Sequence, residues 1–138
     1  MESKFNDINS VKKLWWLHDS YWHATVVKAF GAEKANELNL VAAEKFFRKY
    51  TLMLLKSGEI KRPESIDDLV EIFRVVWGTC FPDGMYLDAP ITFDGNTAIW
   101  TGSTCHAYDS LRAAKMDENY ACGCQAIRNG VMKALRLV

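Results

Sequence analysis

Two glycines, Gly31 and Gly58, each stand at the end of a long stretch with helical character. Glycine readily adopts the left-handed backbone conformation that closes a helix, so both residues suit a C-terminal cap. We expect one helix from near Asp7 or Ser10 to Gly31 and a second over residues 32–57. A chain that begins with two such helices is predicted to be mainly helical.

Apolar residues of the first stretch recur at spacings of three and four, which predicts a single buried stripe. The stripe consists of Val11, Leu14, Trp15, Trp22, Val26, Ala29 and Phe30. His18 lies on the same stripe. We therefore expect Trp22 to be a core residue, and Trp22→Ala to lower the free energy of unfolding by about 3 to 5 kcal/mol.

The second stretch is apolar on most sides between Phe46 and Leu55. A helix of this kind is typically packed centrally rather than laid on the surface. We expect this helix to occupy the centre of the fold, with a bend or a restart near Asn39.

Three further helices are expected. Ser65 followed three residues later by Asp68 resembles a capping box, so a helix should begin there and run to about Trp77. Two more helices are predicted over residues 106–115 and 122–137, separated by a polar stretch.

Between these helices the pattern changes to short runs of strand-forming residues. The runs cover residues 85–87, 91–93 and 97–101, and Asp94-Gly95-Asn96 joins the last two as a hairpin. So few strands are not stable alone and must pack on the helices. The predicted class is α+β, mainly helical with a small antiparallel β-hairpin or three-stranded sheet, in a single domain over residues 1–138.

Charge and composition narrow the range of partners. Lys plus Arg and Asp plus Glu number 17 each, so the basic surplus typical of nucleic-acid binders is missing. The sequence has neither a secretory leader pattern nor an apolar run of membrane-spanning length, and we expect a cytoplasmic protein with no membrane partner. In that compartment its four cysteines should remain thiols.

The most reactive side chains of the sequence are Cys105, His106, Cys122 and Cys124. Both cysteine groups fall where a predicted helix begins, and the positive end of a helix dipole favours a thiolate. We expect Cys105 and Cys122 to meet near a cavity, with Cys105, Cys122 and His106 as the catalytic candidates. Cys124 instead continues an apolar helical stripe and should point into the core. The alternative is that all these cysteines fill gaps in the packing.

A metal site built from the same four residues is the less favoured reading. Structural zinc sites use ligand pairs separated by two to four residues, whereas Cys105 and His106 are adjacent and Cys122 and Cys124 flank a single glycine. No phosphate-binding loop, serine-hydrolase elbow, zinc-protease motif or Cys-x-x-Cys is present. We expect neither a metal nor another cofactor.

The first helix offers a second candidate site. Asp19 and His23 are spaced to touch on the helix surface, where the pair is either a general base or an ordinary surface contact. His18 is the preferred pocket residue because it shares its stripe with Trp22, and both are candidates for substrate binding.

Three motifs of the sequence carry a family resemblance. They are Leu14-Trp15-Trp16-Leu17-His18-Asp19 with Trp22, Glu37-Leu38-Asn39, and Cys122-Gly-Cys124-Gln-Ala-Ile-Arg128-Asn-Gly130. Together they resemble a group of uncharacterised prokaryotic cytosolic proteins that is distantly similar to the L-2-amino-thiazoline-4-carboxylic acid hydrolases. In those hydrolases a strand ends in a cysteine that opens a helix, and a second cysteine follows; Cys105 and Cys122 match these positions. An acidic residue often follows the second cysteine by three places there, and this chain has Gln125 instead.

The leading hypothesis is a thiol-dependent hydrolase of a carbon–nitrogen bond in a small heterocyclic substrate. Cys105 or Cys122 would attack, His106 or His18 would carry the proton, and Arg128 would hold a substrate carboxylate. One alternative is a non-catalytic small-molecule-binding or sensor module, in which the aromatic first helix and the hairpin line a pocket. Another is an assembly protein with an exposed Trp15-Trp16 surface. The sequence does not define an oligomeric state.

Overall fold

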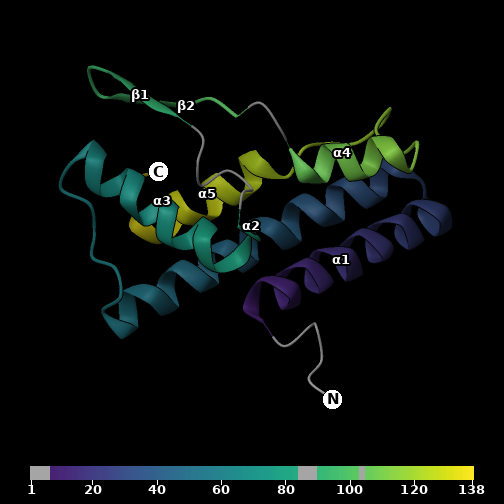
Figure 1. Cartoon of the computed structure of the whole chain (residues 1–138), viewed down its shortest axis with the longest axis horizontal. Helices are drawn as coiled ribbons and strands as arrows, with labels where there is room; N and C mark the ends of the chain where they lie inside the picture. The colour runs from purple at the N-terminus through teal and green to yellow at the C-terminus, as the bar shows by residue number, and fades with distance from the viewer. Residues whose placement is uncertain (1–6, 84–89, 103–104) are drawn as a thin grey trace.

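The computed structural model describes residues 7–83, 90–102 and 105–138. Within these residues the chain forms five helices and a two-stranded antiparallel hairpin (Figure 1). In chain order the elements are α1 (Ile8–Phe30), α2 (Ala32–Ser57), α3 (Ile66–Cys80), β1 (Ile91–Asp94), β2 (Thr97–Trp100), α4 (His106–Ala113) and α5 (Cys124–Leu135). The predicted class, α+β and mainly helical with a small hairpin, is confirmed. The strand expected over residues 85–87 lies outside the described residues.

Local capping signals define the helix ends as the sequence predicts. The Asp7 carboxylate accepts a hydrogen bond from the Ser10 backbone N–H at 2.9 Å and begins α1. Gly58 closes α2 in the left-handed conformation, with φ of 80°. Ser65 and Asp68 form the reciprocal capping box expected at the start of α3. The restart considered near Asn39 is wrong, because α2 is one uninterrupted helix.

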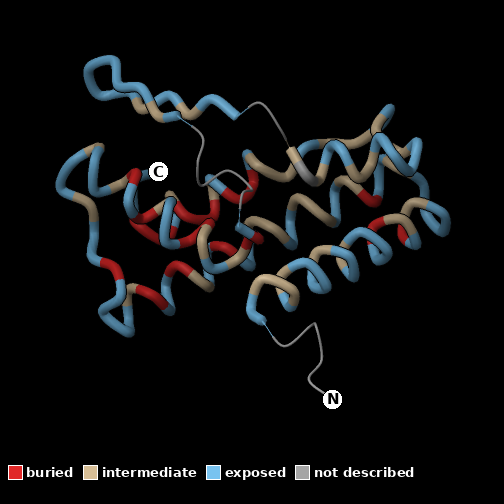
Figure 2. The backbone as a smooth tube through the Cα atoms, in the orientation of Figure 1, coloured by how far each residue is buried: buried red, intermediate tan, exposed pale blue. Residues whose placement is uncertain are grey.

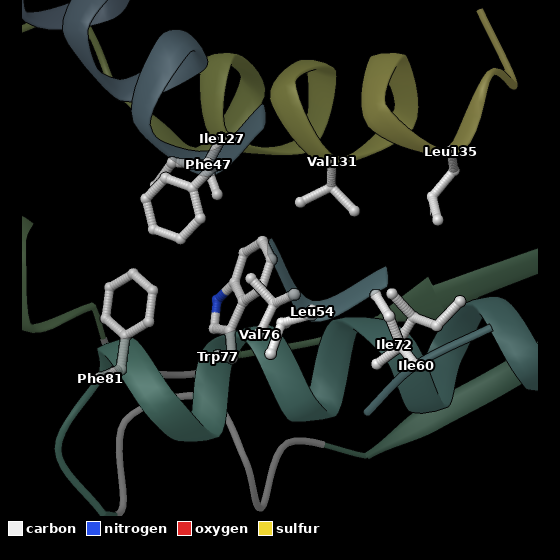
Figure 3. Packing of buried hydrophobic residues seen from close by; sticks show 10 residues of the cluster. All are labelled: Phe47, Leu54, Ile60, Ile72, Val76, Trp77, Phe81, Ile127, Val131 and Leu135. Carbon is white, nitrogen blue, oxygen red and sulfur yellow. The ribbon is translucent and has the colours of Figure 1, made fainter. Parts of the chain in front are cut away.

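The core lies where α2, α3 and α5 meet. Figure 3 shows α3 side chains such as Val76 and Trp77 facing Val131 of α5, with Phe47 of α2 beside them. The whole cluster consists of Phe47, Leu54, Ile60, Ile72, Val76, Trp77, Phe81, Ile127, Val131 and Leu135. The apolar stripe predicted for the last helix is therefore a core face, and α2 is central as expected.

The backbones of α2 and α5 approach closely at Gly130. A Cβ atom at this position would overlap the Glu44 carbonyl oxygen and would lie 2.9 Å from the Arg48 backbone nitrogen. Only a residue without a side chain fits such an approach. The spacing of these two helices is therefore fixed by one glycine.

The buried stripe predicted for α1 is wrong. Only His23 and Val26 of this helix are buried, and Trp22 is 64% exposed. Figure 2 shows α1 mostly in the colour of exposed residues, in contrast to α3 and α5. Trp16, which is not a member of the predicted stripe, is the aromatic residue that packs inward: it stacks on Phe81 with ring centroids 4.7 Å apart. Apolar residues surround α1 on most sides, so their spacing alone selected the wrong face.

The hairpin packs on α3. Its strands pair in register from Ile91 opposite Trp100 to Asp94 opposite Thr97. Trp100 reaches Trp77 of α3, with ring centroids 6.3 Å apart. In the described part of the chain, no helix is both long enough and apolar enough for a membrane crossing.

Candidate functional site

Three cysteine thiols gather at the start of α5. Cys122 is exposed in the preceding loop, Cys124 is the first residue of the helix, and Cys105 precedes α4. The pKa of Cys124 is raised to about 12, chiefly by burial and also by neighbouring Cys122 and Cys105, while Arg128 acts against the shift. The Cys124 S–H donates a hydrogen bond to the Cys122 sulfur. Cys124 is thus a protonated thiol at neutral pH, beside an exposed one.

Tyr120 lies next to these thiols. Burial raises the pKa of its phenol to about 12, Cys122, Cys124 and Cys105 contribute in the same direction, and a hydrogen bond from the Gly123 backbone N–H opposes the shift. The ring of His23 meets Tyr120 edge-on, with centroids 5.5 Å apart and planes at 87°. Tyr120 therefore links the cysteine cluster to α1.

Asn36 of α2 holds the loop that carries Tyr120. Its side-chain amide donates to the Asn119 carbonyl at 2.6 Å and accepts from the Ala121 backbone N–H at 3.1 Å. This double contact fixes the loop in a single position against α2, because both ends of one amide group are used. Nothing in the sequence near Asn36 announces this role, since its partners lie more than 80 residues away.

A small pocket lies between α1, α2 and this loop. It has a volume of about 190 Å³, and its polar lining comes from His23, Asn36, Lys115, Glu118, Asn119 and Tyr120. Burial lowers the pKa of His23, and the nearby Asp19 carboxylate acts in the opposite direction. An imidazole with a lowered pKa is an effective hydrogen-bond acceptor or base at neutral pH.

A second, wider pocket lies between α2 and α5. Its volume is about 340 Å³. Its lining consists of Leu40, Val41, Glu44, Lys45, Cys122, Gln125, Ala126 and Asn129. Gln125 donates to the Asn129 side chain at 3.0 Å, one turn along α5. This pocket combines an exposed thiol with amide groups and the Lys45 ammonium, so it offers a nucleophile together with polar groups that can orient a ligand.

The structure divides the site residues predicted from sequence. Cys105 and Cys122 both lie close enough to Cys124 and Tyr120 to influence their pKa values. Arg128 also adjoins Cys124 but lines neither of the two pockets. The side chain of His106 lies outside the described part of the structure.

The residues chosen on α1 do not reach this site. His18 stacks on Trp15 with ring centroids 6.1 Å apart, on the exposed side of the helix, and Trp22 is exposed as well. The histidine of α1 that contacts the loop before α5 is His23, whose ring meets Tyr120. The hairpin residues that the structure describes line neither of these two pockets.

A metal centre receives no support from the described residues, among which no three His, Cys, Asp or Glu side chains are placed to hold one ion. Cys80 lies away from the cluster at the end of α3, where burial raises its pKa to about 11 and Lys12 acts against the shift. No protein-family model, curated protein or solved structure matches this chain.

Proposed function

We propose that this chain is a thiol-dependent enzyme that hydrolyses a carbon–nitrogen bond in a small heterocyclic substrate, with Cys122 as its nucleophile. One observation carries the proposal: the exposed Cys122 thiol lines the α2–α5 pocket together with the amide side chains of Gln125 and Asn129. An accessible cysteine can react as its thiolate, which is the nucleophilic form.

The chemistry follows the usual course of covalent catalysis by a thiolate. The Cys122 sulfur forms a bond to the electrophilic carbon, the carbon–nitrogen bond breaks, and the nitrogen leaves with a proton. Water then attacks the same carbon, the carbon–sulfur bond breaks, and the thiol is restored. The side chains of Gln125 and Asn129 lie in the pocket, where their amide groups can hydrogen-bond the polarised atoms of the substrate.

The Lys45 side chain supplies the positive charge on this pocket's wall, and it replaces Arg128 as the proposed partner of a substrate carboxylate. His23 has a lowered pKa, but it lies on the far side of Tyr120. We assign it to the neighbouring pocket rather than to the attack by Cys122. Cys105 is proposed to support the cluster, since it adjoins Cys124 and Tyr120 and lines neither pocket.

The first test is the rate at which native thiols react with iodoacetamide across pH 6 to 9, read residue by residue by mass spectrometry. Cys122 should react fastest, and Cys124 and Cys80 slowly, because their raised pKa values leave little thiolate. The fast reaction should be lost in Cys122→Ser and retained in Cys80→Ala. Labelling of Cys122 that is no faster than that of Cys124 and Cys80 would remove the basis of the proposal.

The second test is activity. A panel of cyclic amidines and thiazoline carboxylates, including 2-amino-thiazoline-4-carboxylate, is incubated with the protein and its ring-opened products are measured by mass spectrometry. Turnover should be lost in Cys122→Ser and retained in Cys80→Ser. Turnover that survives Cys122→Ser would assign the chemistry to another group.

A small-molecule-binding module remains the second candidate, and the pocket formed by His23, Asn36 and Tyr120 favours it. In that case a ligand from the same panel would bind without being converted, and His23→Ala would abolish binding. Calorimetry of the wild type and of Cys122→Ser separates the two functions. A binding module should bind the ligand with the same affinity in both proteins, whereas the enzyme should lose its turnover in Cys122→Ser.

A further inference from the structure

Neither the fold nor the proposed site explains the exposed side of α1. Trp15, Trp22 and Tyr21 are 58%, 64% and 70% exposed. Val11, Leu14 and Leu17 are also about half exposed, and His18 stacks on Trp15 within the same surface. We call the surface formed by Val11, Leu14, Trp15, Leu17, His18, Tyr21 and Trp22 the α1 face.

The α1 face also lacks charge. Between Leu14 and Val27 no exposed residue of the helix is Lys, Arg, Asp or Glu. These fourteen positions span about 21 Å of helix at the usual rise of 1.5 Å per residue. A helix that is apolar on most of its sides is normally buried on most of its sides. Within one chain, however, only His23 and Val26 of α1 are buried.

We propose that two copies of this chain form a homodimer in which the α1 face of one protomer packs against the α1 face of the other. A second copy is the occupant that the surface favours. A two-fold axis sets the same patch against itself, and an aromatic surface without exposed carboxylates or ammonium groups has no like charges to bring together. Tryptophan and tyrosine are also the residues that most often dominate such interfaces.

The proposal is independent of the thiol chemistry. The pocket between α2 and α5 has no α1 residue in its lining, so dimerisation can fail while Cys122 keeps its reactivity, and the reverse also holds. His23 and Val27 of α1 do line the smaller pocket. Dimerisation therefore holds in place the helix that forms one wall of that smaller pocket.

The test is sedimentation velocity of the full chain over a range of concentrations. The wild type should sediment as a dimer of about 31 kDa, twice the mass of one chain. Trp22→Glu should raise the dimer dissociation constant by at least about a hundredfold, since the introduced charge occurs twice in a two-fold interface. Phe93→Glu is the matched control: Phe93 is 49% exposed on the hairpin, and its replacement should leave the dimer intact.

Circular dichroism of each variant establishes that the fold is retained. If Trp22→Glu does not fold, Tyr21→Arg takes its place, because that side chain is still more exposed. The proposal is overturned if the wild type remains monomeric at high concentration. It is also overturned if neither Trp22→Glu nor Tyr21→Arg weakens the dimer. Binding of a monomeric wild type to phosphatidylcholine–phosphatidylglycerol vesicles, lost in Trp22→Glu, would also overturn it in favour of a membrane surface.

Discussion

At the scale of single residues, Gly130 decides how closely two helices approach. Alanine in place of glycine normally stabilises a helix by up to about 1 kcal/mol. At this position the added methyl group would meet the backbone of Glu44 and Arg48, which cannot move aside as a side chain can. Alanine at position 130 is therefore expected to destabilise the protein, where it would normally stabilise a helix.

We predict that Gly130→Ala lowers the free energy of unfolding by about 2 to 4 kcal/mol, the range typical of an overpacked core. Gly123→Ala is the control. Its φ of −72° suits any residue, and a Cβ there would lie 3.9 Å from the Asn39 side chain, which is ordinary contact. Urea denaturation of both variants checks the pair, and equal effects would show that helix spacing is not the cause.

His23 makes the stability of the protein depend on pH in a known direction. Burial lowers its pKa below the ordinary 6.5, so protons bind the unfolded chain more readily than the folded one. The contribution of His23 to stability is complete above pH 6.5 and decreases as the pH falls toward its lowered pKa. The nearby Asp19 has a pKa raised above 3.8 by burial, and its contribution has the opposite sign at lower pH.

We therefore predict that the wild type loses stability between pH 7 and pH 5.5 and that His23→Gln loses less over this interval. Thermal unfolding at fixed ionic strength measures both proteins. A wild-type slope retained in His23→Gln would assign the pH dependence to other groups.

At the scale of elements, two tryptophans of α1, Trp16 and Trp22, play different roles. Trp16 stacks on Phe81 and donates a hydrogen bond to the Cys80 carbonyl at 2.8 Å, so it attaches α1 to the end of α3. Trp22 makes no such attachment and belongs to the exposed α1 face. The loss of 3 to 5 kcal/mol expected for Trp22 as a core residue is therefore not expected of the isolated fold.

We predict that Trp16→Ala lowers the free energy of unfolding by about 2 to 3 kcal/mol, below the full range for buried tryptophan because the side chain is only partly buried. Its effect on the melting temperature should be the same at every protein concentration. The effect of Trp22→Ala should instead grow with concentration, since stability from association follows mass action. Melting curves at two widely separated concentrations distinguish the two, and concentration-independent effects for both would place Trp22 in the fold itself.

At the scale of the whole molecule, the core joins segments that are far apart in the chain. Val76 of α3 and Val131 of α5 are both completely buried in the same cluster, and Figure 3 shows their side chains directed toward each other. Both helices bury apolar side chains in this one cluster together with α2, so α3 and α5 should fold as one cooperative unit.

A double-mutant cycle tests this unit. Val76→Ala and Val131→Ala together should differ from the sum of the single effects by about 0.5 kcal/mol or more, as expected for residues that share a packing site. Val70→Ala paired with Val131→Ala is the control, because Val70 is buried but lies outside the cluster. Additive effects in both pairs would show that α3 and α5 do not depend on each other.

Much of the secondary structure could be predicted from the sequence, because helix caps and hairpin turns act within a few residues. Neighbouring residues alone were enough to recognise three such features. They are the Ser65–Asp68 capping box, the closing glycines Gly31 and Gly58, and the hairpin around Gly95. The buried stripe of α5 was also clear, since polar residues occupy its other sides and leave one choice of face.

Only the tertiary structure decided which side of α1 is buried and which residues surround the cysteines. Apolar residues occupy most of the circumference of α1, so periodicity could not distinguish the side bearing His23 from the side bearing Trp22. The meeting of His23, Asn36 and Tyr120 depends on contacts across more than 80 residues of chain. Local sequence patterns carry no signal for such contacts, because these form only when α1, α2 and the loop before α5 pack together.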